Sequence, residues 1–278
     1  MKEIADNSSQ SLRLVCHTLR FNRGQIYYRN KEIDLRCTPR MDDEPVLEKI
    51  KEVIKDRATY GYRRVSAMLR KRIGMFINKK RVYRIMKRFG LLLKRKRRSR
   101  RIHWGRIATV QINKRWCTDI TGIVSWNGEK GRFAFILDCC NREVLSWRFQ
   151  RHLQWVDIAL MLDEAIDNRL GDTPLAAKGI ELLHDNGPEF TANAFKDYVE
   201  KDLGMIDCCT PVHSPESNGM AESFIGTFKR DYVYENILED FETVKRMIPG
   251  WIDDYNCVAP HSALGMKSPR EFLNIVAA

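Results

Sequence analysis

The sequence predicts an α/β fold in which a mixed five-stranded sheet with flanking helices is preceded by an all-helical region. Two observations carry this prediction. Residues 46–93 repeat apolar side chains every three or four positions, which is typical of amphipathic helices. From residue 116 onward, short apolar runs rich in β-branched and aromatic residues alternate with longer helical patterns, which indicates strands and helices in one domain.

The net charge of +12 is unevenly distributed along the chain. Residues 1–115 hold 33 Lys and Arg against 10 Asp and Glu, a net charge of +23, whereas residues 116–278 hold 15 against 26, a net charge of −11. The basic front half predicts binding to a polyanion. In the acidic back half, carboxylates are more plausibly used for catalysis than for binding nucleic acid. The eight cysteines form no CxxC pair, which argues against a zinc knuckle or a thioredoxin-like site.

Neither a membrane span nor a secretory signal is predicted. No apolar run reaches the ~20 residues that a membrane span needs, and residues 1–10 are polar and of mixed charge, unlike a signal peptide. We therefore expect an intracellular, cytoplasmic protein with no membrane partner.

Residues 1–45 are expected to form an N-terminal helical segment and a linker. Leu12, Val15, Cys16 and Leu19 recur at helical spacing, and Pro39 and Pro45 interrupt the charged stretch that follows. The helical part suits either a small helix-turn-helix remnant or a helix that only packs.

Residues 46–93 are predicted to form three short helices, the arrangement of a helix-turn-helix DNA-binding region. Tyr60 to Arg64 is expected to be a turn, Gly74 to end the second helix, and Asn78 to cap the third. The third helix is apolar on one side and basic on the other, which predicts DNA contact, although a solvated basic face on a plain bundle is the alternative. The expected DNA contacts are Arg63, Arg64, Lys79, Lys80, Arg81 and Arg84.

Residues 94–115 are expected to be a basic linker. Seven of the eight residues from Lys94 to Arg101 are positively charged, a density that a packed core excludes. Such a segment neutralises phosphates, so we expect it to track DNA; a solubility tail is the alternative. Its predicted contacts are Lys94, Arg95, Lys96, Arg97 and Arg98.

Residues 116–236 are predicted to form the catalytic core, and residues 237–278 a C-terminal helical extension. Strands are expected at 116–125, 133–138, 144–149, 181–184 and 205–210, with Asn127-Gly128 as a hairpin turn. Helices are expected at about 155–170, around 195–199, and at 217–236. This order, βββαβαβα, is that of a ribonuclease-H-like sheet, whose first and fourth strands are neighbours.

Three acids are placed to converge in such a sheet. Asp119 lies within the first strand, Asp185 follows the fourth, and Glu222 lies on the last helix of the core. Three carboxylates from separate elements suit two Mg²⁺ ions ~4 Å apart, because Mg²⁺ prefers hard oxygen ligands. Asp138 and Glu216 are competing acids, and ordinary strand-end and helix-surface acids are the alternative for all of them.

Several blocks of sequence, in order, resemble one family. Those around the three acids are Trp116-Cys117-Thr118-Asp119, His184-Asp185-Asn186-Gly187 and Ser214 to Phe224. They are similar to the signature blocks of DDE transposases with a retroviral-integrase core, in particular the second-reading-frame product of bacterial copy-out–paste-in insertion sequences. The tail with Tyr255-Asn256 and His261 to Gly265 resembles that family's C-terminal signature, and Tyr60 to Arg84 resembles its helix-turn-helix.

The resemblance implies a mechanism. Asp119, Asp185 and Glu222 would bind two Mg²⁺ or Mn²⁺ ions for hydrolysis at the end of a mobile element, followed by attack of the freed 3′-hydroxyl on another phosphodiester. Asp138 is then expected to be structural or substrate-side, and Glu222 is preferred over Glu216 because it follows the Gly219 turn. Thirty-six residues separate Asp185 from Glu222, one more than is usual in the family, which a loop insertion would absorb.

The resemblance also implies DNA contacts and partners. Lys229 lies two helical turns beyond Glu222 on the same face, and either contacts a phosphate or is simply solvated. The expected partners are element ends and target DNA, further copies of this chain on DNA, and an upstream-frame product, without which we expect weak end recognition. His184 and His213 are expected to be hydrogen-bonded structural histidines, and the protein to work at the bacterial nucleoid.

Two other functions remain open. One is a catalytically inert DNA-binding accessory or repressor protein, in which only the basic half works. The other is a ribonuclease H acting on RNA–DNA hybrids, which shares the fold but has no use for a helix-turn-helix.

Overall fold

The computed structural model describes residues 43–94, 109–171, 175–210 and 219–276. The predictions for residues 1–42, for the basic residues Arg95 to Arg98, and for His213 and Glu216 lie outside the described residues.

The helical region consists of α4 (Asp43–Asp56), α5 (Tyr62–Ile73) and α6 (Lys79–Arg88), which pack around their own apolar core. Asn78 caps α6 as predicted, because its side chain accepts a hydrogen bond from the N–H of Lys80 at 2.9 Å. Gly74 ends α5 in the left-handed conformation (φ 69°), which favours glycine. The predicted turn from Tyr60 to Arg64 is wrong in its second half, because α5 begins at Tyr62 and places both arginines on its first turn.

The sheet has the order β3-β2-β1-β4-β5. Its strands are β1 (Arg115–Val124), β2 (Lys130–Asp138), β3 (Val144–Gln150), β4 (Glu181–His184) and β5 (Ile206–Cys209). The first three strands are antiparallel, while β4 is parallel to both β1 and β5. The predicted ribonuclease-H-like order and the adjacency of the first and fourth strands are therefore confirmed.

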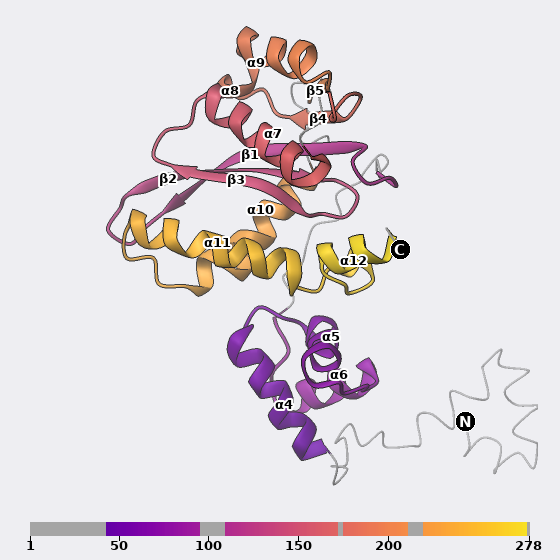
Figure 1. Ribbon diagram of the computed structural model, residues 1–278. Coiled ribbons are helices and arrows are strands. Elements are labelled where there is room, and N and C mark those ends of the chain that lie inside the picture. Colours follow the sequence, from indigo (N-terminus) through magenta and orange to yellow (C-terminus); the bar gives the residue numbers. More distant parts are fainter. Residues whose placement is uncertain (1–42, 95–108, 172–174, 211–218, 277–278) are drawn as a thin grey trace, which may run out of the picture.

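Helices cover both faces of this sheet (Figure 1). On one face α7 (Trp155–Leu170), α8 (Pro188–Thr191), α9 (Asn193–Asp197) and the π-helix η1 (Tyr198–Asp202) pack on Ala134 and Ile136 of β2. On the other, α10 (Gly219–Asp231) and α11 (Phe241–Cys257) pack on Phe133 and Phe135. This alternation along β2 follows from the two-residue period of a strand.

The C-terminal part is helical, as predicted, but it is not a separate layer. After α10 come the 3₁₀-helices η2 (Val233–Glu235) and η3 (Ser262–Leu264), which flank α11, and then α12 (Pro269–Val276). The helix predicted to reach residue 236 thus ends at Asp231. One apolar core contains Phe228 of α10 together with Val244, Ile248 and Trp251 of α11. The hydrophobic core therefore continues across the predicted boundary at residue 236. Among the described helices, none combines the length and apolarity of a membrane span.

Candidate active site

Asp119 and Asp185 meet because β1 and β4 are parallel neighbours. The last paired positions of the two strands are Cys117 and Leu183, and each aspartate lies two residues farther along its own strand direction. Both side chains are half-buried. Asp119 accepts a hydrogen bond from the N–H of Ile120 through Oδ1 at 2.7 Å, which fixes one of its carboxylate oxygens.

The turn after β4 is built to hold Asp185. The N–H of Gly187 donates to Asp185 Oδ1 at 3.0 Å. A Cβ atom at position 187 would lie 3.1 Å from that same oxygen, a tight contact, so a larger residue here would push the Asp185 carboxylate from its place. Asn186 donates from Nδ2 to the carbonyl of Thr210 at 2.9 Å and so ties the turn to the end of β5. Asn186 and Gly187 thus shape the loop that carries Asp185.

Glu222 lies in the first turn of α10 and is exposed. A carboxylate in the first turn is favoured by the partial positive charge of the helix N-terminus. The three predicted acids therefore come from a strand, a strand end and a helix start.

The electrostatics link these three acids to one another. The pKa of Asp119 is raised to about 6, first by burial and then by the charges of Asp185 and Glu222, while the hydrogen bond from the N–H of Ile120 acts in the opposite direction. Within the described residues, no Lys or Arg forms an ion pair with any of the three. Nor does the described part contain three or more His, Cys, Asp or Glu side chains already close enough to enclose a metal ion. The three carboxylates thus bring negative charge to one region of the core, but they are not yet close enough together to enclose an ion.

His184 holds the backbone next to Asp185 in place. It is fully buried, its Nδ1 lies 2.7 Å from the carbonyl oxygen of Asp185, and its Nε2 lies 2.5 Å from Oδ1 of Asp207 on β5. Its ring also stacks on Phe190, with 5.0 Å between centroids. These contacts fix the backbone from which Asp185 projects, in agreement with the predicted structural role.

Sequence reasoning missed a fourth acid beside Asp185. Glu189 is buried on α8, and its Oε2 would lie 3.4 Å from a Cβ at Gly187. Unlike the other three acids, it is paired with a guanidinium, that of Arg132 on β2. The position of Glu189, four residues after Asp185 in the sequence, could have indicated that it lies near the site. The arginine, 57 residues away, becomes a neighbour only through the fold.

The competing acid Asp138 is structural. It is fully buried and accepts hydrogen bonds from the backbone N–H groups of Asn113, Cys140 and Asn141 at 2.7, 2.7 and 3.1 Å. These bonds occupy its oxygens in closing the turn from β2 to β3, so it is unavailable as a ligand.

The predicted DNA contacts occupy different environments. Lys79, Lys80 and Arg63 are exposed on the helical region, and so is Lys94. Arg81 and Arg84 both pair with the buried Asp43, at 2.9 and 2.8 Å. Arg64 contacts Asp231 of the catalytic core at 2.6 Å. Lys229 is partly buried, and this burial lowers the pKa of its ammonium group.

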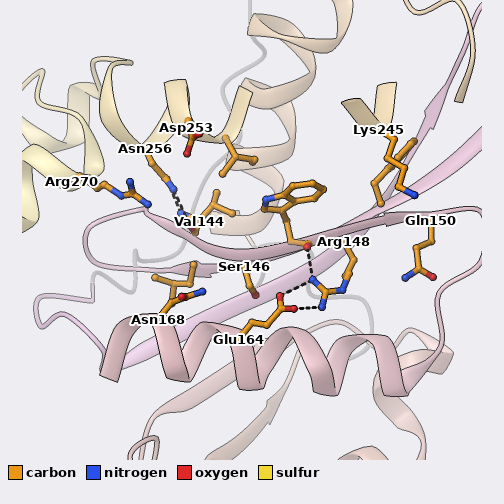
Figure 2. A pocket seen from close by; sticks show the side chains of 14 residues that line it. Val144, Ser146, Arg148, Gln150, Glu164, Asn168, Lys245, Asp253, Asn256 and Arg270 are labelled. Carbon is orange, nitrogen blue, oxygen red and sulfur yellow. Dashed lines mark hydrogen bonds and ion pairs between the residues drawn. The ribbon is translucent and has the colours of Figure 1, made fainter. Parts of the chain in front are cut away.

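A groove of about 560 Å³ lies away from the three acids, along the outer edge of β3 between α7 and α11 (Figure 2). Asn256 closes this sheet edge, because its side chain accepts from the N–H of Val144 and donates to the same residue's carbonyl at 3.0 and 2.9 Å. Arg148 covers the next stretch by binding Glu164 and the carbonyl of Trp147. The Tyr255-Asn256 motif thus protects an edge strand from unwanted pairing.

Comparison with family models agrees with this organisation. The chain matches "Integrase core domain" over residues 110–215 and again over 208–269, and "HTH-like domain" over residues 41–99. The first two matches contain all three candidate acids, and the third contains α4 to α6.

Curated relatives and solved structures extend the comparison. "Transposase InsD for insertion element IS2A/D/F/H/I/K" of Escherichia coli is 40% identical over 274 residues, covering 94% of this chain and 90% of the relative. Similar solved structures include the HTLV-2 integrase catalytic core domain in complex with magnesium (17% identity, TM-score 0.43, 58% of this chain and 95% of that one). Another is the Mos1 transposase catalytic domain with raltegravir and Mg (19% identity, TM-score 0.41, 50% and 71%). On the identity and coverage of the InsD relative, and on the two family models, the chain belongs to the insertion-element transposases with an integrase core domain, which are DDE-type enzymes that cleave nucleic acid in transposition.

Proposed function

We propose that Asp119, Asp185 and Glu222 are the catalytic carboxylates of this transposase and hold two Mg²⁺ or Mn²⁺ ions. The observation that carries the proposal is a set of three carboxylates, from β1, the end of β4 and the start of α10, that no described Lys or Arg neutralises. Burial and the two neighbouring carboxylates raise the pKa of Asp119, which means that its ionised form lacks a positive partner.

The donor chemistry fits the proposed metal. All three groups offer hard oxygen atoms, the ligands that Mg²⁺ prefers, and none offers sulfur or nitrogen. When bound, a pair of such ions would activate the attacking oxygen and stabilise the leaving oxygen of a phosphodiester. Since the carboxylates are openly spaced, bound cations would draw Glu222 toward the two aspartates. His184 and Gly187 would meanwhile keep Asp185 in place through the bonds described above.

The proposed reaction has two stages on one site. Water first attacks the phosphodiester at the element's end and releases a 3′-hydroxyl. That hydroxyl then attacks a phosphodiester of the target DNA, forms a new phosphodiester with its phosphorus, and displaces the target strand's 3′-oxygen, which leaves as a 3′-hydroxyl. The protein residues orient the DNA and exclude alternative geometries, so positioning matters as much as charge.

The proposed DNA surface combines the exposed lysines of α6, Lys79 and Lys80, with Arg63, Lys94 and the basic residues after it. Lys229 is included because, within the described residues, no acid forms an ion pair with it. We further propose that the enzyme acts as a homo-oligomer on DNA, together with an upstream-frame product, in the cytoplasm at the bacterial nucleoid.

The test is cleavage of labelled element-end DNA in Mn²⁺ by Asp119→Asn, Asp185→Asn and Glu222→Gln. Each variant is expected to lose about 10³-fold or more in cleavage rate, equivalent to about 4 kcal/mol of barrier, while DNA affinity stays within a few-fold. Glu242→Gln, the same change on the exposed face of α11, is the matched control and should retain the wild-type rate. Wild-type strand transfer by any of the three variants would remove that residue from the site. Tight DNA binding by the unmodified chain without cleavage would instead favour the inert accessory protein.

A further inference from the structure

The helical region touches the catalytic core through three basic residues. Arg64 of α5 is the first: its Nη1 lies 2.6 Å from Oδ2 of Asp231, the last residue of α10. The hydroxyl of Thr59 donates to the other oxygen of Asp231 at 2.6 Å. The Asp231 carboxylate is only 4% exposed and also accepts from its neighbour Arg230. A buried carboxylate of this kind needs its positive partners, so the contact is an integral part of the packing.

Arg57 makes the second contact, with Asp254 of α11. Asp254 also accepts from the hydroxyl of Tyr232 at 2.7 Å, just beyond the end of α10. Tyr60 is almost fully buried between the two arginines, with the Arg64 guanidinium 4.1 Å and that of Arg57 5.7 Å from its ring centre. Stacking on an aromatic ring fixes both guanidinium groups toward the core.

Lys71 makes the third contact at the other end of α5. Its Nζ lies 2.7 Å from Oε1 of Glu271 on α12. The same ammonium group donates to the carbonyls of Cys257 and Val258 at 2.9 and 3.2 Å, at the C-terminus of α11. A cation at this position also complements the negative end of the helix. Val258 packs against the apolar core of the helical region, which adds burial to the charge pairing.

These contacts lead to the helix that carries Glu222. Glu222 is in the first turn of α10 and Asp231 is its last residue, so one rigid helix joins the proposed active site to the helical region. Nine residues of α-helix correspond to about 13 Å. We propose that the three ion pairs Arg57–Asp254, Arg64–Asp231 and Lys71–Glu271 form a clasp that holds the DNA-binding region in a fixed position relative to α10. The three basic residues are then positioning residues for DNA cleavage.

The clasp deepens the proposed function, on which it rests, and it changes one assignment. Arg64 was predicted from the sequence to contact DNA, but its guanidinium is engaged with Asp231 and Tyr60. Its neighbour Arg63 is exposed, and its guanidinium lies against the ring and hydroxyl of Tyr62. The two adjacent arginines therefore have different roles: Arg63 is available to contact DNA, and Arg64 binds the catalytic core. DNA held by the exposed residues reaches the site in one register only while the clasp is closed.

The test uses the full chain and a charge exchange at the most exposed pair. The single variants Lys71→Glu and Glu271→Lys open this contact. The double variant restores the ion pair with the charges reversed, but not the bonds from Lys71 to the carbonyls of Cys257 and Val258. Affinity for element-end DNA is measured separately from the single-turnover cleavage rate at saturating DNA. Each single variant is expected to bind DNA within about three-fold of wild type, to cleave at least 10-fold more slowly, and to spread cleavage over neighbouring phosphodiesters. The double variant should recover part of the rate and of the preference for a single cleavage position.

Arg72→Glu is the matched control. It makes the same charge change one residue along α5, but Arg72 pairs with Asp56 inside the helical region, so the cleavage rate should stay within two-fold. If Lys71→Glu and Arg72→Glu behave alike, or if the double variant recovers nothing, the clasp is overturned. Faster cleavage by the single variants would overturn it too, since the contact would then be inhibitory.

Hydrogen exchange keeps this test separate from the proposed function. The amides of the last turn of α10 and of Val258 should exchange faster in Lys71→Glu and return part of the way toward the wild-type rate in the double variant. Unchanged exchange would refute the clasp. Restored exchange in a chain that never cleaves DNA would leave the clasp standing and refute the proposed chemistry.

Discussion

The acidic residues of this transposase fall into two groups with opposite surroundings. Glu143, Glu189 and Asp231 are buried, and each is paired with at least one arginine. The proposed catalytic acids, Asp119, Asp185 and Glu222, have no such partner within the described residues. The first group stabilises the fold, because a buried charge is tolerated when it is paired and hydrogen-bonded. The second group is left with uncompensated charge, which is a condition that suits cation binding and opposes folding.

The pKa values separate the two groups. Burial alone would raise the pKa of Asp231, but bonds and charges from Arg230, Arg64 and Thr59 bring it below its ordinary value. The pKa of Asp43 is likewise lowered, because Arg81 and Arg84 outweigh the effect of burial. At Asp119 burial acts in the same direction as the neighbouring carboxylates, and the pKa rises to about 6. The difference lies in the partners that the fold supplies.

The largest effect is expected when a paired acid loses its charge. Glu143 binds Arg169 at 2.6 Å and Arg270 at 3.1 Å, and both Glu143 and Arg169 are about 9% exposed at the side chain. Glu143→Gln leaves the buried Arg169 guanidinium with only the more distant carboxylate of Asp138, 4.0 Å away, as a described negative partner. We therefore expect the free energy of unfolding in urea to fall by about 3 kcal/mol. Glu242→Gln on the surface should change it by less than about 0.5 kcal/mol. Equal effects of the two variants would erase the distinction between the groups.

Divalent cations should act on the unpaired group only. A ligand that binds the folded state at a hundred times its dissociation constant stabilises that state by about 2.7 kcal/mol. We therefore expect Mn²⁺ to raise the melting temperature of the wild-type chain and EDTA to reverse the rise. Asp119→Asn should lose most of this response, whereas Glu143→Gln, although less stable, should keep it. An equal response in Asp119→Asn would mean that the cation binds elsewhere.

The partly buried imidazole of His261 provides a pH-dependent contrast to both groups of acids. Burial, aided by the charges of Arg142 and Arg64, lowers the pKa of His261 from 6.5 to about 4, and its Nε2 finds no hydrogen-bond partner among the residues that the structure describes. Because the unfolded chain takes up the proton first, stability is complete above pH 6.5 and is lost as the pH falls toward 4. The loss is expected to be about 2 kcal/mol between pH 6.5 and 4.5. His261→Leu should show a shallower pH dependence in urea unfolding, and an unchanged slope would contradict the assignment.

Sequence patterns predicted the parts of this fold that depend on local order. The ribonuclease-H-like strand order, the Asn78 cap and the meeting of Asp119 with Asp185 all follow from periodicity and from the neighbouring positions of the first and fourth strands. The Glu189–Arg132 pair and the Arg64–Asp231 contact were not predictable, because each joins residues far apart in sequence. A basic residue on an amphipathic helix looks the same in sequence whether it faces a phosphate or a buried carboxylate. That ambiguity misassigned Arg64. The start of α5 at Tyr62, three residues earlier than expected, was missed because Tyr60 to Arg64 was interpreted as a turn.

The smallest expected effect is an increase in stability, whereas most substitutions lower it. Asp119→Asn should stabilise the metal-free protein, because the amide removes a half-buried charge that has two carboxylates as neighbours and no cation. A rise in pKa of about two units corresponds to nearly 3 kcal/mol, but Asp119 is partly exposed and solvent screening reduces the gain to about 1 kcal/mol. Urea unfolding at pH 8 in EDTA measures this gain, and excess Mn²⁺ should reverse the ranking by stabilising only the wild type. A destabilised Asp119→Asn in EDTA would show that the carboxylate has a structural partner, and Asp119 would then belong with the paired acids. The reversal of rank with the metal distinguishes a site that binds cations from an acid that is merely buried, since an acid of that kind would give the same ranking under both conditions.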